Sequence, residues 1–278
     1  MTVLHTLRDT VVAASLLALV FAPLEWAFAA RAHQPWRRPR LALDVAFFLG
    51  NYLLWGGLAI WLLEALSFAL GGWVPPGVRA GFAGQPFWLQ AAEIVALGDL
   101  GIYWFHRACH AWEPLWRIHR VHHSAEHLDW VAAHREHPLD GLLSQLVLNL
   151  PALALGFSVE VVGTFFLFRG LWSIFIHSNV RVPLGPLRWL LGAPEVHAWH
   201  HARHPGRVAN FANLAPWCDL LFGTYRCPAP EERFELGLPE PIELGYFALL
   251  FGCFFQGSKK ERIGAAAHPA PSREARAA

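Results

Sequence analysis

Three short stretches of the sequence carry most of its clustered histidines. HRACH, HRVHH and HAWHH, which we call the histidine boxes, repeat histidine at spacings of three and four residues, so each predicts a helical face lined with imidazoles. Their histidines are His106, His110, His119, His122, His123, His197, His200 and His201. Several imidazoles on one face would be buried together without charge partners unless something binds their lone pairs. Because imidazole is a good ligand for zinc, copper, iron and nickel, the spacing predicts metal binding.

The number of these side chains indicates more than one metal ion. A structural zinc site takes four ligands, whereas the boxes supply eight, and His137 in REHP and His177 in HSN are further single candidates. Eight to ten imidazoles predict two metals with about four or five ligands each. Isolated histidines such as His5, His33 and His268 are more simply structural or solvated side chains.

The composition indicates that the boxes belong to a membrane protein. The 278-residue chain is 55% hydrophobic and only 15% charged, with a mean hydropathy of +0.32. Soluble domains average about 45–50% apolar and 25% charged residues. A net charge of +1 gives no electrostatic reason to expect a nucleic-acid partner. The four cysteines form no C-x-x-C pair, which argues against a disulfide framework and a thiolate zinc site.

Five apolar stretches are long enough, or nearly so, to cross about 30 Å of hydrocarbon, which takes about 20 helical residues. They are expected at residues 10–30, 43–70, 86–105, 139–157 and 158–176. The second is long enough to tilt or to form two pieces, and Glu93 and Asp99 interrupt the third. A retained first helix fits better than a cleavable signal peptide, because the segment is long and contains Glu25. The short run at 244–255 is expected to be re-entrant, interfacial or packed on the bundle.

Arginine placement orients these spans. The loop at 31–40 carries four arginines and residues 71–85 carry one, so the positive-inside tendency places the first loop in the cytoplasm. All three boxes then fall on the cytoplasmic side. The sequence predicts an all-α, polytopic bundle of four to five membrane helices with a cytoplasmic helical cap that carries the boxes. We expect one membrane domain over residues 1–257, with a box core at about 99–225, and a disordered tail at 258–278.

The boxes and their surroundings resemble the fatty acid hydroxylase/sterol desaturase superfamily of integral membrane di-iron oxygenases. The resemblance rests on H-x3-H and two H-x2-H-H boxes in order, within DLGIYWFHRACH, WRIHRVHHS and HAWHH. REHP, HSN and NFANLAPWCDLLFGTY follow the R-x-H-P, H-[AS]-N and N-Y-G…W-D-x-x-F-G-T-Y patterns, with NFA in place of N-Y-G. It covers nearly half the chain and implies metal ligands at the eight box histidines and His177, with His137 as a tenth. The histidines near the boxes but off the pattern are His127, His134 and His204.

The resemblance also implies the chemistry. Such enzymes use O2 and two iron ions to hydroxylate an unactivated C–H bond of a lipid such as a sterol or fatty acyl chain, while the protein positions metals and substrate. Zinc is able to occupy imidazole sites in purified or recombinant material. No His-Pro-Gly-Gly heme motif of cytochrome b5 occurs, so electrons are expected from a separate ferredoxin or cytochrome b5-type protein and its reductase. Lysine is nearly absent, which suggests a GC-rich bacterial genome and thus the bacterial cytoplasmic membrane.

Two acidic residues are candidates for orienting the histidines, because a ligating imidazole needs an acceptor for its second nitrogen. Asp99 lies seven residues before His106 and eleven before His110, on the same helical stripe, and is expected to orient one of them. By resemblance, Asp219 in WCDLLFGTY serves similarly.

Three further charged residues have open roles. Glu136 and Asp140 flank His137, and their spacing does not choose between them. Arg169 interrupts the fifth span, and intramembrane charges usually face a cavity or a partner. Its candidate partners are a substrate head group, Glu160 and Glu93.

Other functions fit the sequence less well. Desaturation by the same di-iron site stays open, because the boxes do not distinguish it from hydroxylation. A transition-metal transporter would also place histidines in membrane helices, but transporters bind near the bilayer midplane, and here the boxes follow the cytoplasmic ends of the spans. A catalytically silent lipid-binding relative would not need the complete set of boxes.

Overall fold

The computed structural model describes residues 3–254 except 183, 204–207, 230–231, 241, 243–244 and 253. Its elements are α1 (Val3–Ala27), α2 (Leu41–Gly50), the π-helix η1 (Asn51–Trp55), α3 (Gly56–Gly71), α4 (Pro76–Ala83), α5 (Phe87–Ala111), α6 (Glu113–His123), the 3-10 helix η2 (Ala132–His134), α7 (Pro138–Leu155), α8 (Val159–His177), the 3-10 helix η3 (Gly185–Trp189), α9 (Pro194–His200), α10 (Trp217–Leu221) and α11 (Tyr246–Gly252). Extended pairing within the described ranges is limited to isolated bridges, so the all-α prediction is confirmed.

Four helical runs are long and apolar enough to cross a membrane. They are Leu4–Ala27, Leu41–Gly71, Pro138–Leu155 and Val159–His177. The second combines α2, η1 and α3 into one 31-residue run, so the predicted stretch is continuous rather than two separate pieces. The third predicted span, at 86–105, lies within α5, which has 25 residues but is less apolar than the other four. The protein is therefore an integral membrane protein with four candidate spans and α5 packed beside them.

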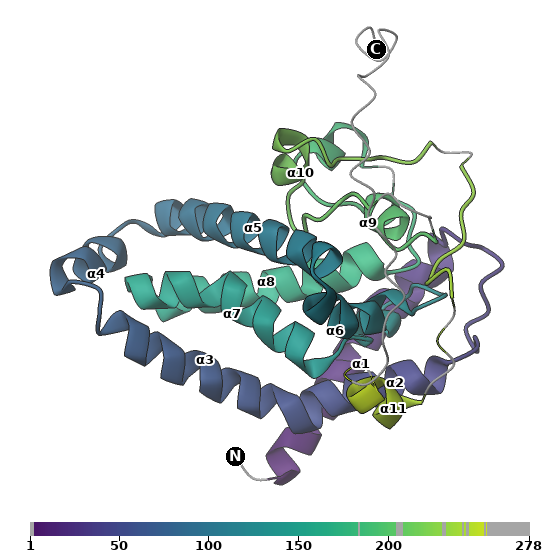
Figure 1. The fold of residues 1–278 in the computed structure, drawn as a ribbon, viewed down its shortest axis with the longest axis horizontal. Helices are drawn as coiled ribbons and strands as arrows, with labels where there is room; N and C mark the ends of the chain where they lie inside the picture. Colours follow the sequence, from purple (N-terminus) through teal and green to yellow (C-terminus); the bar gives the residue numbers. More distant parts are fainter. Residues whose placement is uncertain are drawn as a thin grey trace, which may run out of the picture.

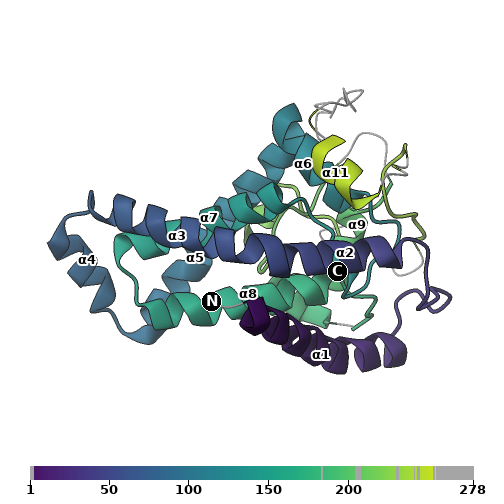
Figure 2. The ribbon, with the colours of Figure 1, turned by 90° about the horizontal axis from the view of Figure 1, so that it is seen from below.

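The long helices lie side by side, and the elements that carry the boxes gather at one end. Helices α3, α5, α7 and α8 run together, with α4 at one end and α6, α9 and α10 at the other (Figure 1). Seen from below, α1 runs beside α8 (Figure 2). Leu17 and Phe21 of α1 pack there against Phe48 and Ile174.

The arginine-rich loop lies at the same end as the boxes. Gln34 donates to the carbonyl of Leu128 at 3.0 Å, and Arg38 is bonded to Asp129. Because Leu128 and Asp129 lie in the loop that follows α6, the loop at 31–40 and the second box share one end of the bundle. The packing therefore places the loop at 31–40 and the second box at the same end, as the arginine count predicted.

The hairpin between α7 and α8 has a local cause. Helix α7 ends at Gly156, whose φ of 91° is accessible mainly to glycine, and a Cβ there would lie 2.9 Å from the Cβ of Arg79. Ser158 then begins α8, because its side chain accepts a hydrogen bond from the amide of Val161. The two helices are thus joined by a turn of very few residues, as the abutting apolar runs predicted.

The short C-terminal helix packs on the bundle. Leu249 and Leu250 of α11 are buried against Phe47 of α2 and Val121 of α6. This matches the expectation that the short run at 244–255 does not span the membrane, for the part that the structure describes. The predicted disordered tail at 258–278 lies outside the described residues.

Candidate metal centre

Four helix ends bring nine histidines together. They come from the end of α5, from α6, from the last residue of α8 and from α9 with its C-terminal neighbour. The five-histidine group consists of His106, His110, His119, His123 and His200. The four-histidine group consists of His122, His177, His197 and His201. Within each group, one ring nitrogen of each histidine lies within 4.8 Å of those of the others.

Two boxes are divided between the groups in the same way. On α6, His119 and His123 enter the five-histidine group and His122 enters the other; the last box sends His197 and His201 to the four-histidine group. Positions i and i+4 lie about 40° apart around a helix, whereas i and i+3 lie about 60° apart on the opposite side. The spacing H-x2-H-H therefore supplies two imidazoles to one group and one to its neighbour. The groups touch where His123 stacks on His201, with ring centroids 4.5 Å apart.

In the four-histidine group, lone pairs face each other. The Nδ1 of His122 lies 3.1 Å from the carbonyl of Arg135, and the Nδ1 of His177 lies 2.6 Å from the carbonyl of Ser173. A carbonyl only accepts, so both Nδ1 atoms carry the proton and both Nε2 atoms of the neutral rings carry a lone pair. These two Nε2 atoms are 2.9 Å apart. Two acceptors at that distance repel unless a cation binds both.

The five-histidine group leaves lone pairs without partners. The Nδ1 of His106 donates to the carbonyl of Phe211 at 2.8 Å, and the Nδ1 of His200 donates to the carbonyl of Ala209 at 2.7 Å. Their Nε2 atoms therefore point lone pairs into the group, where they are buried and have no hydrogen-bond donor among the described residues. The Nε2 of His110 is likewise buried without a described partner. Such acceptors are costly to bury, and a metal ion would satisfy them.

The electrostatics favour neutral imidazoles. Burial, followed by repulsion from neighbouring histidines, holds the pKa of His122, His123 and His201 well below the usual value. Burial lowers the pKa of His200 to about 3. At neutral pH these rings keep the free lone pairs that metal binding requires.

Most of the anchoring acceptors are backbone carbonyls, but His119 has a carboxylate. Its Nδ1 lies 2.8 Å from Oδ2 of Asp140, in the first turn of α7, and both side chains are buried. A buried carboxylate that holds the second nitrogen of an imidazole fixes the ring orientation and raises its basicity. Of the two acids that flank His137, Asp140 is therefore the one that orients a grouped histidine.

A buried ionic network supports the anchor of His122. Arg135, whose carbonyl accepts from that ring, is 1% exposed. Its guanidinium contacts Asp44 of α2 and donates to the carbonyl of Ser124 at 3.0 Å. Arg38 joins Asp44 to Asp129. The sequence analysis did not detect this network, because its four charged residues are spread over nearly a hundred positions.

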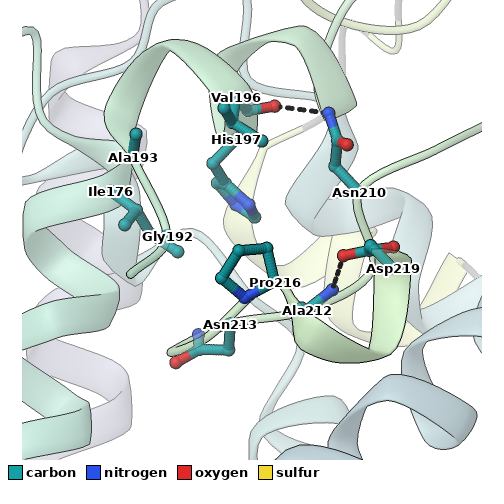
Figure 3. A pocket seen from close by; sticks show the side chains of 10 residues that line it. All are labelled: Ile176, Gly192, Ala193, Val196, His197, Asn210, Ala212, Asn213, Pro216 and Asp219. Carbon is teal, nitrogen blue, oxygen red and sulfur yellow. Dashed lines mark hydrogen bonds between the residues drawn. The ribbon is translucent and has the colours of Figure 1, made fainter. Parts of the chain in front are cut away.

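Asp219 acts through the loop that anchors His106. Its carboxylate accepts from the amides of Phe211 and Ala212, at 2.9 and 2.8 Å, and from the hydroxyl of Thr224. The predicted orienting role is therefore indirect: Asp219 holds the backbone whose carbonyl holds the ring. Figure 3 shows its bond to Ala212 and the neighbouring bond from Asn210 to the carbonyl of Val196. The cavity between them measures about 10 Å³, which is too small for a lipid.

Asn210 ties the same loop to α9. It has a φ of 64°, which asparagine tolerates better than most residues. Its side chain also pairs with the backbone of Arg226, accepting from the amide and donating to the carbonyl, both at 2.7 Å. It is 2% exposed, so the asparagine of the NFA segment serves to fix the backbone beside the site.

Contrary to our expectation, Asp99 does not contact His106 or His110 but has other partners. Its carboxylate contacts Nη1 of Arg169 at 2.6 Å and Nε1 of Trp217 at 3.2 Å. Seven helical residues correspond to about 10.5 Å along the axis, so sharing a stripe with His106 does not bring the carboxylate within reach of that ring. The same contact identifies the partner of Arg169, which is neither Glu160 nor Glu93.

His137 is not part of either group. Its Nδ1 accepts from the amide of Leu139 at 3.2 Å, and its Nε2 lies 3.0 Å from the carbonyl of Leu250. Both ring nitrogens are thereby engaged, so His137 begins α7 instead of joining the other nine. His127 is half-buried outside the groups, and His134 packs edge-on against Phe48. His204 lies outside the described residues.

Comparison with known proteins agrees with this geometry. The Fatty acid hydroxylase family model matches residues 91–224, which contain all nine grouped histidines. This match and the relatives named below support the resemblance to the fatty acid hydroxylase/sterol desaturase superfamily. It is 31% identical over 186 residues to an ornithine lipid hydroxylase of Rhizobium tropici, covering 64% of this chain and 55% of the relative.

Other relatives act on different lipids. An alkylglycerol monooxygenase of Danio rerio is 35% identical over 146 residues, 52% of this chain and 32% of the relative. A Delta(7)-sterol-C5(6)-desaturase of Nicotiana tabacum is 31% identical over 154 residues, 53% and 54% of the two chains. The chain thus spans between about a third and just over half of the curated relatives it matches. No solved structure matches it.

Proposed function

We propose that this protein is a membrane-bound oxygenase that hydroxylates an unactivated C–H bond of a lipid. It would hold two iron ions and use O2 together with electrons from a separate ferredoxin or cytochrome b5-type protein and its reductase. The observation that carries the proposal is the pair of adjacent groups of five and four buried imidazoles, with lone pairs directed inward.

The donor set fits iron. Nine nitrogen donors in two groups exceed what one tetrahedral zinc site takes, and imidazole suits iron as well as zinc. His106, His110, His119, His123 and His200 would hold one ion, and His122, His177, His197 and His201 the other. When bound, the two ions supply the O2-dependent redox chemistry that side chains lack. The chain holds the rings through carbonyls and Asp140, and it excludes water, since eight of the nine histidines are buried. Purified material is expected to contain zinc where iron is scarce.

The related desaturases support a second candidate activity at the same site. Hydroxylation adds one oxygen atom to the product, whereas desaturation removes two hydrogen atoms, so product mass distinguishes them. The relatives with named activities are hydroxylases, monooxygenases and desaturases, so they lend no support to a transporter.

We also propose the orientation and domain organisation that the arginine pattern predicts. The boxes would face the cytoplasm of a bacterial cell, where a soluble electron donor reaches them, and no nucleic-acid partner is expected. Residues 1–257 would form one membrane domain. The bacterial relative and the shared position of the loop at 31–40 and the boxes support this arrangement.

Substitution within the two groups tests the function. The wild-type chain, expressed in an iron-replete host with a donor and its reductase, should contain two irons and convert cellular lipids to products heavier by one oxygen from ¹⁸O2. His122→Ala removes a ligand of the four-histidine group, and His200→Ala one of the five-histidine group. Either variant should lose metal and turnover.

His127→Ala is the matched control, because His127 lies between the second box and η2 but belongs to neither group. It should keep wild-type metal content and products. Turnover that persists in His122→Ala or His200→Ala would rule out a shared metal centre, and products lighter by two hydrogens would assign desaturation instead.

A further inference from the structure

A second cavity lies across the first turn of α7 from the metal centre. It measures about 330 Å³, within the usual range for small-molecule sites. Its walls come from η1, α3, the start of α7 and the C-terminal part around α11, and most of its lining is apolar, including Leu142 and Leu250. None of the nine grouped histidines lines it. The cavity is therefore separate from the metal centre.

The cavity opens along the apolar surface of the protein. Several of its lining side chains are themselves exposed: Leu58 is 48% exposed, Leu139 43% and Phe251 59%. Leu58 lies within the candidate span at 41–71, and Leu139 within the span at 138–155. A hydrocarbon chain in the bilayer would thus reach the cavity from the side, without crossing water.

One acid is placed at this cavity without a counter-ion. Glu136 lines the cavity, is half-buried, and its carboxylate has no ion pair or hydrogen bond among the described residues. A Cβ at Gly141 would lie 2.5 Å from Oε1 of Glu136, so the glycine leaves the space that the carboxylate fills. A carboxylate in mostly apolar surroundings is costly without a cation, which makes it complementary to a positively charged head group.

The helix that forms the facing wall is irregular at this point. Asn51 and Trp55, the first and last residues of the π-helix, both line the cavity. The Oδ1 of Asn51 and Nε1 of Trp55 are buried without a partner among the described residues. π-Helical turns occur frequently at functional sites because they change where side chains point. The cavity wall therefore carries unsatisfied polar atoms in addition to Glu136.

The cavity and the metal centre share the first turn of α7. Leu139 and Gly141 line the cavity, while Asp140 between them holds the ring of His119. The first turn of α7 thus connects the cavity to the carboxylate that holds the ring of His119.

We propose that this cavity binds a lipid with an amino head group, with Glu136 as the counter-ion of the ammonium and the walls of α3 and α7 around the hydrocarbon chain. This lipid is the substrate class of the proposed hydroxylase. Its turnover rests on that proposed function. Binding itself does not depend on it.

Two probes with the same C18 chain test the proposal: oleylamine, which is cationic, and oleyl alcohol, which is neutral. Their affinities for the purified full-length protein in detergent are measured by native mass spectrometry. Oleylamine should bind about tenfold more tightly to the wild type, the size expected for a hydrogen bond to a charged group. In Glu136→Gln the two affinities should agree within about twofold.

Glu160→Gln is the matched control, because Glu160 is an exposed acid at the start of α8 outside the cavity. It should retain the full preference for oleylamine. Ala59→Phe, which fills the cavity without changing its charge, should weaken both probes. Equal affinities in the wild type, or a preference that survives in Glu136→Gln, would overturn the proposal.

Iron content and turnover are measured on the same samples. Glu136→Gln should keep wild-type iron, because Glu136 contacts none of the grouped histidines. Active, iron-loaded protein without a preference for oleylamine would refute the lipid assignment and leave the proposed function intact. If the protein prefers oleylamine through Glu136 but neither binds iron nor converts lipids, the proposed function is refuted and the lipid assignment stands.

Discussion

Asp140→Asn is expected to weaken one metal ion selectively. Asp140 is the carboxylate anchor of His119, with 2.8 Å between Oδ2 and Nδ1 and both side chains at most 7% exposed. The amide keeps the shape and one acceptor oxygen but removes the negative charge. Loss of such an anchor typically lowers metal affinity about 10- to 100-fold, or about 1.4–2.7 kcal/mol. The loss should fall on the five-histidine group, because Asp140 contacts no histidine of the other.

The assay is metal retention in the detergent-solubilised protein over a graded series of chelator concentrations. Asp140→Asn should release one ion at a chelator concentration about 10- to 100-fold lower than the wild type does, and the other ion at an unchanged concentration. Asp9→Asn is the control, because Asp9 is exposed and pairs only with its neighbour Arg8 among the described residues. Unchanged retention, or equal loss of both ions by a protein whose melting temperature is unaltered, would refute the anchor.

Three further predictions concern stability and topology. Arg169→Met leaves Asp99 buried without its cation and should lower the free energy of unfolding by about 3–5 kcal/mol, whereas Asp99→Leu/Arg169→Met should recover most of the loss in the same denaturation assay. Gly156→Ala should cost about 1–3 kcal/mol because of its φ of 91° and the contact with Arg79, while Gly163→Ala, where a Cβ meets nothing within 4 Å, should not destabilise. An epitope inserted at 31–40 should resist external protease in spheroplasts and one at 76–83 should be cleaved; the opposite pattern would invert the orientation.

Periodicity and residue type predicted the main architecture and the eight box histidines of the two groups, and they named His177 together with His137, which joins neither group. Apolar runs of spanning length have few structures available in a bilayer, so the all-α bundle followed from composition. The spacings H-x3-H and H-x2-H-H place the rings of each box on one helical face, whereas the meeting of the three boxes with His177 depends on how α5, α6, α8 and α9 pack together. Helical geometry also explains why the middle histidine of each H-x2-H-H box joins a different group from the other two, although the sequence analysis did not derive this division.

The remaining features depend on which elements pack together. Asp99 was assigned to a histidine from its stripe on α5, but its partner is Arg169 of α8, seventy residues away. Glu136 and Asp140 both flank His137, and only the direction of the first turn of α7 gives one to the metal centre and the other to the cavity. Contacts between distant segments leave no periodic signal in a single sequence.

The carbonyl anchors have a consequence for how this sequence tolerates change. The rings of His106, His177 and His200 are held by the backbone oxygens of Phe211, Ser173 and Ala209. Any amino acid supplies such an oxygen, so a substitution at these three positions does not by itself remove the anchor, although the ring of Phe211 also packs against Tyr103. Selection should act instead on the residues that set the path of the backbone. Among homologues, the positions of Asp219 and Asn210 should therefore vary less than the anchoring positions that touch the histidines.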